Sequence, residues 1–204
     1  RHSWSAVAWI DGRTYVAQSG LVGPDGIDAA GERPLYSAGK AAYNLAEGAG
    51  ELTIDLHAEY KGQRVTKRFH FTEHDYVIGV GYEVENQSDR TITTGLFAQI
   101  KRDESEPFGD QPIFLGPKPY LGAAFTTPDS RYEKIDFEDM QKGTFRTTLD
   151  GGWVAFLQHY FLSAWIGDPE ERNNYFGQAR PEGTYVVGFT SPQREIPPGA
   201  KSEW

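Results

Sequence analysis

Three of the five histidines lie close together in the sequence, and two of them have carboxylates nearby. They are His57, His70 and His74, with Asp55 and Glu73 as acidic neighbours. Imidazole nitrogen and carboxylate oxygen both bind zinc, at bond lengths of about 2 Å. Side-chain alternation places His57 and His70 on the solvent face of two paired strands, too far apart along the sheet to share a metal ion. We therefore predict exposed strand histidines and no metal site.

Two acidic clusters contain the residue type that glycosidases use. That chemistry needs two carboxylates on either side of a bound sugar. Both clusters stand in turn-like sequence beside Pro, Gly or Lys, where charges are usually solvated, so we interpret them as loop charges. The clusters are Asp136, Glu138 and Asp139, and Asp168, Glu170 and Glu171.

Cofactor and nucleophile motifs are incomplete or missing in the sequence. Gly79-Val80-Gly81 begins like a dinucleotide-binding fingerprint, but its sixth position is Val84 and no helix is expected after it. There is no Cys, which excludes disulfides, thiol nucleophiles and thiolate metal ligands. The serine-hydrolase elbow, the P-loop and the H-E-x-x-H zinc motif do not occur either. We expect a protein that is not an enzyme, without catalytic, cofactor-binding or metal-binding residues, and its partner-binding residues stay unknown.

A run rich in aromatic residues, Trp153 to Ile166, allows two interpretations. Its rings could form a platform on which sugars stack. We favour core aromatics in two crossing strands, because aliphatic residues fill the positions between the rings. The rings belong to Trp153, Phe156, Tyr160, Phe161 and Trp165, and the aliphatic residues are Val154, Leu157, Leu162 and Ile166.

The elements that position these residues follow from alternation of apolar and polar side chains. Leu52 to Tyr60 and Arg64 to Phe71 both alternate, and a two-residue turn at Lys61-Gly62 joins them as a hairpin. A four-residue turn also keeps the faces matched but loses two charge pairs, so it ranks second. Lys67 is the one misfit on the apolar face. The predicted partners are Tyr60 with Gln63, Glu59 with Arg64, Asp55 with Arg68, Ile54 with Phe69, and Leu52 with Phe71.

Further alternating runs extend the sheet, and little helix is expected. Tyr76 to Glu85 and Thr91 to Lys101 complete a meander of four strands, with a turn at 86–89. Residues Gly20 to Gly50 are interpreted as irregular loops, and a short helical turn is expected near Asp139-Met140. The other candidate strands are Trp4 to Ile10, Ile113 to Leu115, Leu121 to Phe125, Tyr132 to Phe137, Thr144 to Leu149, Trp153 to Ile166 as a broken pair, and Thr184 to Thr190.

Composition limits the classes of partner. The chain has 204 residues, 38% of them apolar and 14% aromatic, which suffices for the core of one large β-sandwich. A formal charge of −9 without clustered Lys or Arg argues against nucleic acid and anionic lipid as partners. The apolar stretch from Trp153 to Ile166 is too short and too polar to span a bilayer, and no leader is expected at the start of the chain. We expect a water-soluble domain.

The run from Gly151 to Ile166 resembles the characteristic segment of the large periplasmic domain of YidC-type membrane protein insertases. The resemblance covers most of the chain from about Leu52 onward. It departs at Gly167-Asp168-Pro169, because the family places Pro directly after the Trp-Ile pair. The other matching stretches are Tyr120 to Phe125 with Thr127-Pro128, Tyr132 to Phe137, Val65 to Phe69, Asp75 to Val77, and Val84 to Asn86.

This resemblance implies an antiparallel β-supersandwich similar to the galactose mutarotase fold, with residues 1–204 as a single periplasmic domain. It implies a non-catalytic scaffold that assists insertion and folding of inner-membrane proteins and docks accessory proteins of the Sec translocon. Nascent membrane proteins would meet the family's transmembrane core, which is absent from this chain. The domain would lie on the periplasmic side of the inner membrane of Gram-negative bacteria, held by transmembrane segments outside this chain. A further strand is expected after Trp204.

The same fold family leaves two alternatives open. Mutarotases use a His and a Glu, and Asn173-Asn174-Tyr175-Phe176 resembles their N-H-x-Y-F segment. Asn174 stands where the His is required, and an amide cannot act as a general acid or base. An aldose-epimerase-like enzyme and a carbohydrate- or peptide-binding module remain as alternative functions.

Overall fold

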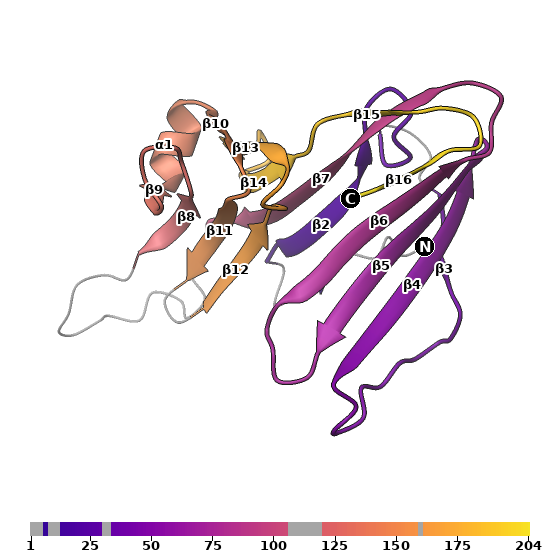
Figure 1. Cartoon of the computed structure of the whole chain (residues 1–204). Helices are drawn as coiled ribbons and strands as arrows, with labels where there is room; N and C mark the ends of the chain where they lie inside the picture. Colours follow the sequence, from indigo (N-terminus) through magenta and orange to yellow (C-terminus); the bar gives the residue numbers. More distant parts are fainter. Residues whose placement is uncertain (1–5, 8–12, 30–33, 106–119, 159–160) are drawn as a thin grey trace. The chain divides into compact units, whose positions relative to one another are not determined.

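The protein, described by a computed structural model, is almost entirely antiparallel β-sheet (Figure 1). Residues 6–7, 13–29, 34–105, 120–158 and 161–204 are described. They divide into two compact units, one containing 21–96 and 193–204, the other 4–20 and 97–192. The predicted all-β, antiparallel class is confirmed. The supersandwich arrangement and the single domain over residues 1–204 stay predictions.

A sheet of five strands forms the frame of the first unit, in the order β16-β6-β5-β4-β3. The expected meander of four strands is present only in part: β4, β5 and β6 are neighbours, whereas the predicted fourth strand, β7 (Ile92–Asp103), belongs to a different sheet. The bounds are Ser37–Ala38 for β3, Glu51–Tyr60 for β4, Gln63–Thr72 for β5, Ile78–Asn86 for β6 and Lys201–Glu203 for β16.

The hairpin of β4 and β5 has the predicted register at all five predicted pairs, from Tyr60 opposite Gln63 to Leu52 opposite Phe71. Arg68 donates two hydrogen bonds to the Asp55 carboxylate, at 2.7 and 2.8 Å. Both turn residues have positive φ, 49° at Lys61 and 77° at Gly62, as the two-residue hairpin turn requires. Charge pairs on one face and apolar pairs on the other therefore fix the register.

Replacing Gly62 with alanine is expected to lower the free energy of unfolding by about 1–2 kcal/mol, because a side chain at this φ is strained. An added Cβ would also lie 3.0 Å from the Ser88 Cβ. The midpoint of urea denaturation measures the loss. Gly48→Ala is the control, since Gly48 has nearly the same φ (78°) but open space around it. The difference between the two variants measures the effect of the contact with Ser88. Equal midpoints for wild type and Gly62→Ala would contradict the prediction.

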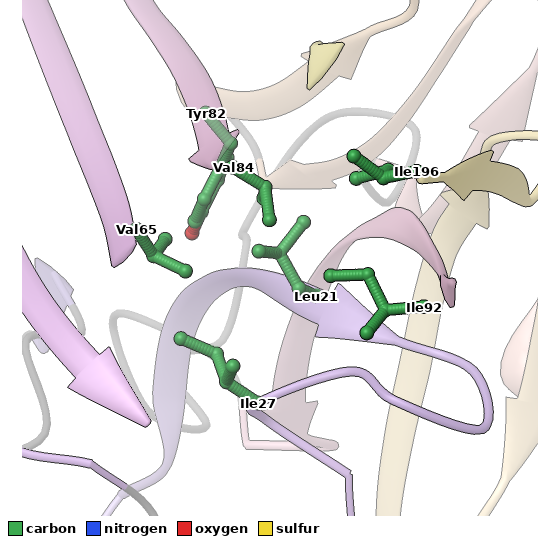
Figure 2. Close-up of a cluster of buried hydrophobic side chains, with 7 residues drawn as sticks. All are labelled: Leu21, Ile27, Val65, Tyr82, Val84, Ile92 and Ile196. Carbon is green, nitrogen blue, oxygen red and sulfur yellow. The ribbon is translucent and has the colours of Figure 1, made fainter. Parts of the chain in front are cut away.

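The apolar face of this sheet covers a compact cluster of buried side chains (Figure 2). The fully buried Val65 and Val84 pack from β5 and β6, and Ile92 packs from β7 (Ile92–Asp103). The region expected to be irregular loop contributes as well. The cluster is Leu21, Ile27, Val65, Tyr82, Val84, Ile92 and Ile196.

Lys67, the misfit of the alternation, is 5% exposed and lies on the apolar face. Its ammonium lies 5.2 Å from the ring centroids of both Phe69 and Tyr82. Burial lowers the pKa of Lys67 to about 8, and the negative charge of Asp28 opposes that shift. Two aromatic faces and one carboxylate thus partly compensate the cost of burying a cation that the strand pattern places inside.

Two further antiparallel sheets belong mainly to the second unit, although the end of β2 and the start of β7 count with the first. The larger has the order β1-β2-β7-β14-β13-β10, and the smaller has the order β12-β11-β8-β9. The Trp165 indole on β12 donates a hydrogen bond of 3.0 Å to the Gln99 carbonyl on β7, so the sheets face one another. The remaining bounds are Ala6–Val7 for β1, Tyr15–Val22 for β2, Leu121–Phe125 for β8, Glu133–Ile135 for β9, Phe145–Asp150 for β10, Trp153–Gln158 for β11, Phe161–Ile166 for β12, Arg172–Ala179 for β13 and Thr184–Thr190 for β14.

The one described helix is α1 (Phe137–Lys142), where a short helical turn was expected. Asp136 caps it, because its carboxylate accepts a hydrogen bond of 2.8 Å from the Asp139 amide. The strand predicted over Tyr132 to Phe137 therefore ends at Ile135, and the buried Phe137 begins the helix.

Several short or polar strands were not predicted from the sequence. Much of β2 and all of β3 fall in stretches without clear alternation, and β13 carries Asn, Gly and Gln at mixed positions. The short β15 (Arg194–Ile196) pairs with the start of β7. Of Trp4 to Ile10, only Ala6–Val7 is described, as a strand, and the predicted strand Ile113 to Leu115 lies outside the described residues.

Candidate binding surfaces

His57 and His70 lie on the exposed face of the first unit's sheet, as the alternation predicts. Nδ1 of His57 lies 3.1 Å from the Thr66 hydroxyl, and Nδ1 of His70 lies 3.2 Å from the Thr53 hydroxyl. His74 stands in the following turn with a φ of 64°. Within the described ranges, no three His, Asp or Glu side chains gather in a way that could hold a metal ion.

Both acidic clusters make local contacts. In the first, Asp136 caps α1 while Glu138 and Asp139 lie 3.0 and 3.3 Å from the Lys142 ammonium. In the second, the Asp168 carboxylate accepts a hydrogen bond of 2.9 Å from the Glu170 amide. The first cluster therefore belongs to a helix start rather than to a loop.

The segment resembling the mutarotase motif lies in β13 and is tied to its own unit. The buried Asn173 donates a hydrogen bond of 3.1 Å to the Glu171 carbonyl, and Asn174 accepts one of 2.8 Å from the Thr148 hydroxyl. Tyr175 donates one of 2.6 Å to the Gly151 carbonyl, and burial raises its pKa to about 12. These hydrogen bonds hold β13 in place beside β10 and the neighbouring turns.

The glycines of Gly79-Val80-Gly81 lie within β6, paired with β5. A Cβ at Gly79 would lie 3.2 Å from the His70 Cβ, and one at Gly81 would lie 3.2 Å from the Trp204 carbonyl oxygen. These glycines thus serve close approach within a sheet.

A buried arginine that the sequence analysis did not single out lies inside the second unit. Arg102 is 1% exposed, and its guanidinium carbon lies 5.4 to 5.7 Å from the ring centroids of Tyr15, Phe137 and Phe156. It donates hydrogen bonds of 2.7 Å to the carbonyls of Asp103 and Ser105. The alternation along β7 indicates this burial, because Arg102 falls on the same face of the strand as the buried Ala98 and Ile100.

The aromatic run forms two adjacent, antiparallel strands, β11 and β12, rather than two crossing strands, and only part of it is core. Phe156 is fully buried, as predicted, and Trp165 is partly buried against β7. The prediction is wrong for Phe161, Leu162 and Ile166, which are 68%, 64% and 63% exposed. Both faces of β12 are apolar, so alternation could not tell which face points outward. Tyr160 lies outside the described residues.

We call the outward residues Leu162, Ala164 and Ile166 the β12 surface. All three are exposed, and none is charged. Their cross-strand partners on β11 are Leu157, Ala155 and Trp153, which are also apolar. Leu157 and Trp153 are partly buried, and Ala155 is buried. Contiguous exposed apolar surface on a folded protein is typical of an interaction site.

Comparison with known proteins covers nearly the whole chain. The family model described as the YidC periplasmic domain matches residues 8–204. A protein of Cellvibrio japonicus named membrane protein insertase YidC is 44% identical over 189 residues, which is 92% of this chain and 34% of that protein. Proteins of the same name from Pseudomonas aeruginosa and Pseudomonas fluorescens are 41% and 42% identical over 94% of this chain, which corresponds to 37% and 34% of those proteins.

The chain thus spans roughly a third of the length of these curated relatives. Among the residues that the structure describes, no helix is long and apolar enough to cross a membrane.

Proposed function

We propose, because this chain belongs to the family of YidC periplasmic domains, that it is the periplasmic module of a membrane protein insertase and acts by presenting a docking surface. The match of the family model over residues 8–204 carries this proposal. The name that the relatives share denotes insertion of membrane proteins and no enzymatic reaction, in agreement with the expectation of a domain without an active site.

We also propose where the domain lies and which proteins it binds. The domain lies on the periplasmic side of the bacterial inner membrane, and other parts of the protein hold it there and receive nascent membrane proteins. Its own partners are accessory proteins of the Sec translocon. The exposed, uncharged β12 surface supports a docking role, because contiguous exposed apolar surface is typical of an interaction site.

Photocrosslinking in the intact protein tests this proposal. A photoreactive amino acid is placed at Leu162 on the β12 surface and, in a matched variant, at Arg146 on the exposed side of β10. Irradiation of whole cells followed by mass spectrometry is expected to identify Sec accessory proteins among the adducts of at least one variant. A set of adducts without any component of the translocon, from both positions, would remove the docking proposal.

The enzymatic alternative has a direct test. Asn174 is exposed and accepts a hydrogen bond from Thr148, and its amide cannot act as a general acid or base. The purified chain is expected to leave the interconversion of aldose anomers at the rate in buffer. A faster rate would restore the epimerase hypothesis.

A further inference from the structure

Among the edge strands that the structure describes, β12 is a long one without charge, proline or another described strand to protect it against pairing. Exposed strand edges attract other strands, and proteins usually protect them with charges, proline or very short length. Strand β10 exposes Arg146 and Asp150, β16 exposes Lys201 and Glu203, and β9 and β3 have only three and two residues. Strand β12 has six residues, Phe161 to Ile166, without a charge or a proline.

The β12 surface also carries the free hydrogen-bonding groups of this edge. The Gly167 amide donates a hydrogen bond of 2.9 Å to the Gly152 carbonyl, so this pair is hydrogen-bonded across the β11–β12 ladder. Hydrogen-bonded and non-hydrogen-bonded pairs alternate in an antiparallel ladder. The amides and carbonyls of Leu162, Ala164 and Ile166 therefore point away from β11. Among the described strands, none pairs with them.

Strand β12 is the last strand of the smaller sheet among the described strands. On its inner side, β12 reaches Gln99 of β7 through Trp165 and Tyr15 of β2 through a hydrogen bond with Ser163. The larger sheet continues past β2 to β1, whereas the smaller sheet ends at β12 in the part of the chain that the structure describes. A strand added to β12 would extend the smaller sheet.

We propose that β12 binds an extended segment of another polypeptide as an additional antiparallel strand. The partner segment carries apolar side chains at alternate positions and no charge, because it lies beside Leu162, Ala164 and Ile166. Main-chain hydrogen bonds provide the affinity and the alternating side chains the selectivity, as in other cases of strand addition. This inference rests on the proposed docking function and specifies the form in which a partner binds.

The geometry provides two sharp variants and a control. Ala164→Pro removes an outward amide without breaking a bond to β11, and proline is tolerated at such edge positions. Ala164→Lys adds a charge of the kind that β10 and β16 expose. Thr148→Pro is the matched control on β10, because the Gly151 amide donates to the Glu171 carbonyl and the same alternation points the Thr148 amide outward.

The probe is a synthetic peptide of alternating valine and threonine with a lysine at each end, and titration is followed by the amide NMR signals of the 204-residue chain. Wild type and Thr148→Pro are expected to bind with shifts centred on residues 161–166. Ala164→Pro and Ala164→Lys should bind about tenfold more weakly or not at all, since they lose a main-chain bond or bury a charge. Unchanged spectra of both variants away from β12 show that the fold is intact.

Three results would overturn the inference: no binding to wild type, equal binding to all four proteins, or association of the chain with itself through β12. Self-association has its own readout, because the sequence has no cysteine and an Ala164→Cys chain can form disulfides only between copies. These outcomes are independent of the crosslinking test. Sec accessory proteins could dock elsewhere while β12 fails to bind the peptide, and the reverse could also hold.

Discussion

Replacing Arg102 with alanine is expected to lower the free energy of unfolding by about 3–4 kcal/mol, as large-to-small changes in a core do. The side chain is 1% exposed and fills the space between the rings of Tyr15, Phe137 and Phe156. Its loss would leave a cavity there and remove the donors to the carbonyls of Asp103 and Ser105. Urea denaturation followed by tryptophan fluorescence measures the change.

Arg102→Met separates packing from charge. Methionine keeps most of the buried volume and removes a cation whose pKa is lowered by burial, so the expected loss is only about 1–2 kcal/mol, for the two carbonyls left without donors. Equal losses for the alanine and methionine variants would show that the guanidinium contacts, rather than the filled volume, stabilise this core. An unchanged midpoint for Arg102→Ala would contradict the prediction altogether.

The sequence predicts best where the two faces of a strand differ in chemistry. In the β4–β5 hairpin only one register pairs Asp55 with Arg68 and Ile54 with Phe69, and that register is the observed one. In β12 both faces are apolar, so the pattern predicts a buried strand, whereas Leu162 and Ile166 are exposed. Which face is covered depends on neighbouring strands that join from distant parts of the sequence.

The unpredicted β13 and the two buried cations show the same limit. Strand β13 buries Asn173 and Tyr175 by giving their polar groups backbone partners, which only the folded chain provides. Lys67 and Arg102 follow the parity of the buried faces of their strands, but residue type argues for exposure. Apart from Phe69 on the strand of Lys67 itself, the aromatic rings beside them come from other strands and from α1, so sequence distance hides most of the contacts that make their burial tolerable.

Replacing Lys67 with methionine is expected to stabilise the protein at neutral pH, by up to about 3 kcal/mol. The folded-state pKa is about 8, against an ordinary value of 10.5. Below pH 8 the ammonium is charged in both states, and the folded state bears the cost of burying it. The methionine variant does not bear this cost, but it also loses the attraction between the ammonium and Asp28. The Asp28 carboxylate still accepts its hydrogen bond of 2.9 Å from the Leu21 amide.

The pH dependence gives the sharper test. Between pH 8 and pH 10.5 the unfolded chain binds the proton more tightly than the folded one, so the wild-type free energy of unfolding rises with pH through this window. Lys67→Met lacks this contribution, so its advantage over wild type should shrink by about 3 kcal/mol across the window. Urea midpoints at several pH values measure it, with the exposed Lys40→Met as the control, whose curve should parallel that of wild type. A constant difference between wild type and Lys67→Met from pH 7 to pH 10.5 would mean that Lys67 titrates alike in both states, and the two aromatic faces would then compensate its burial fully.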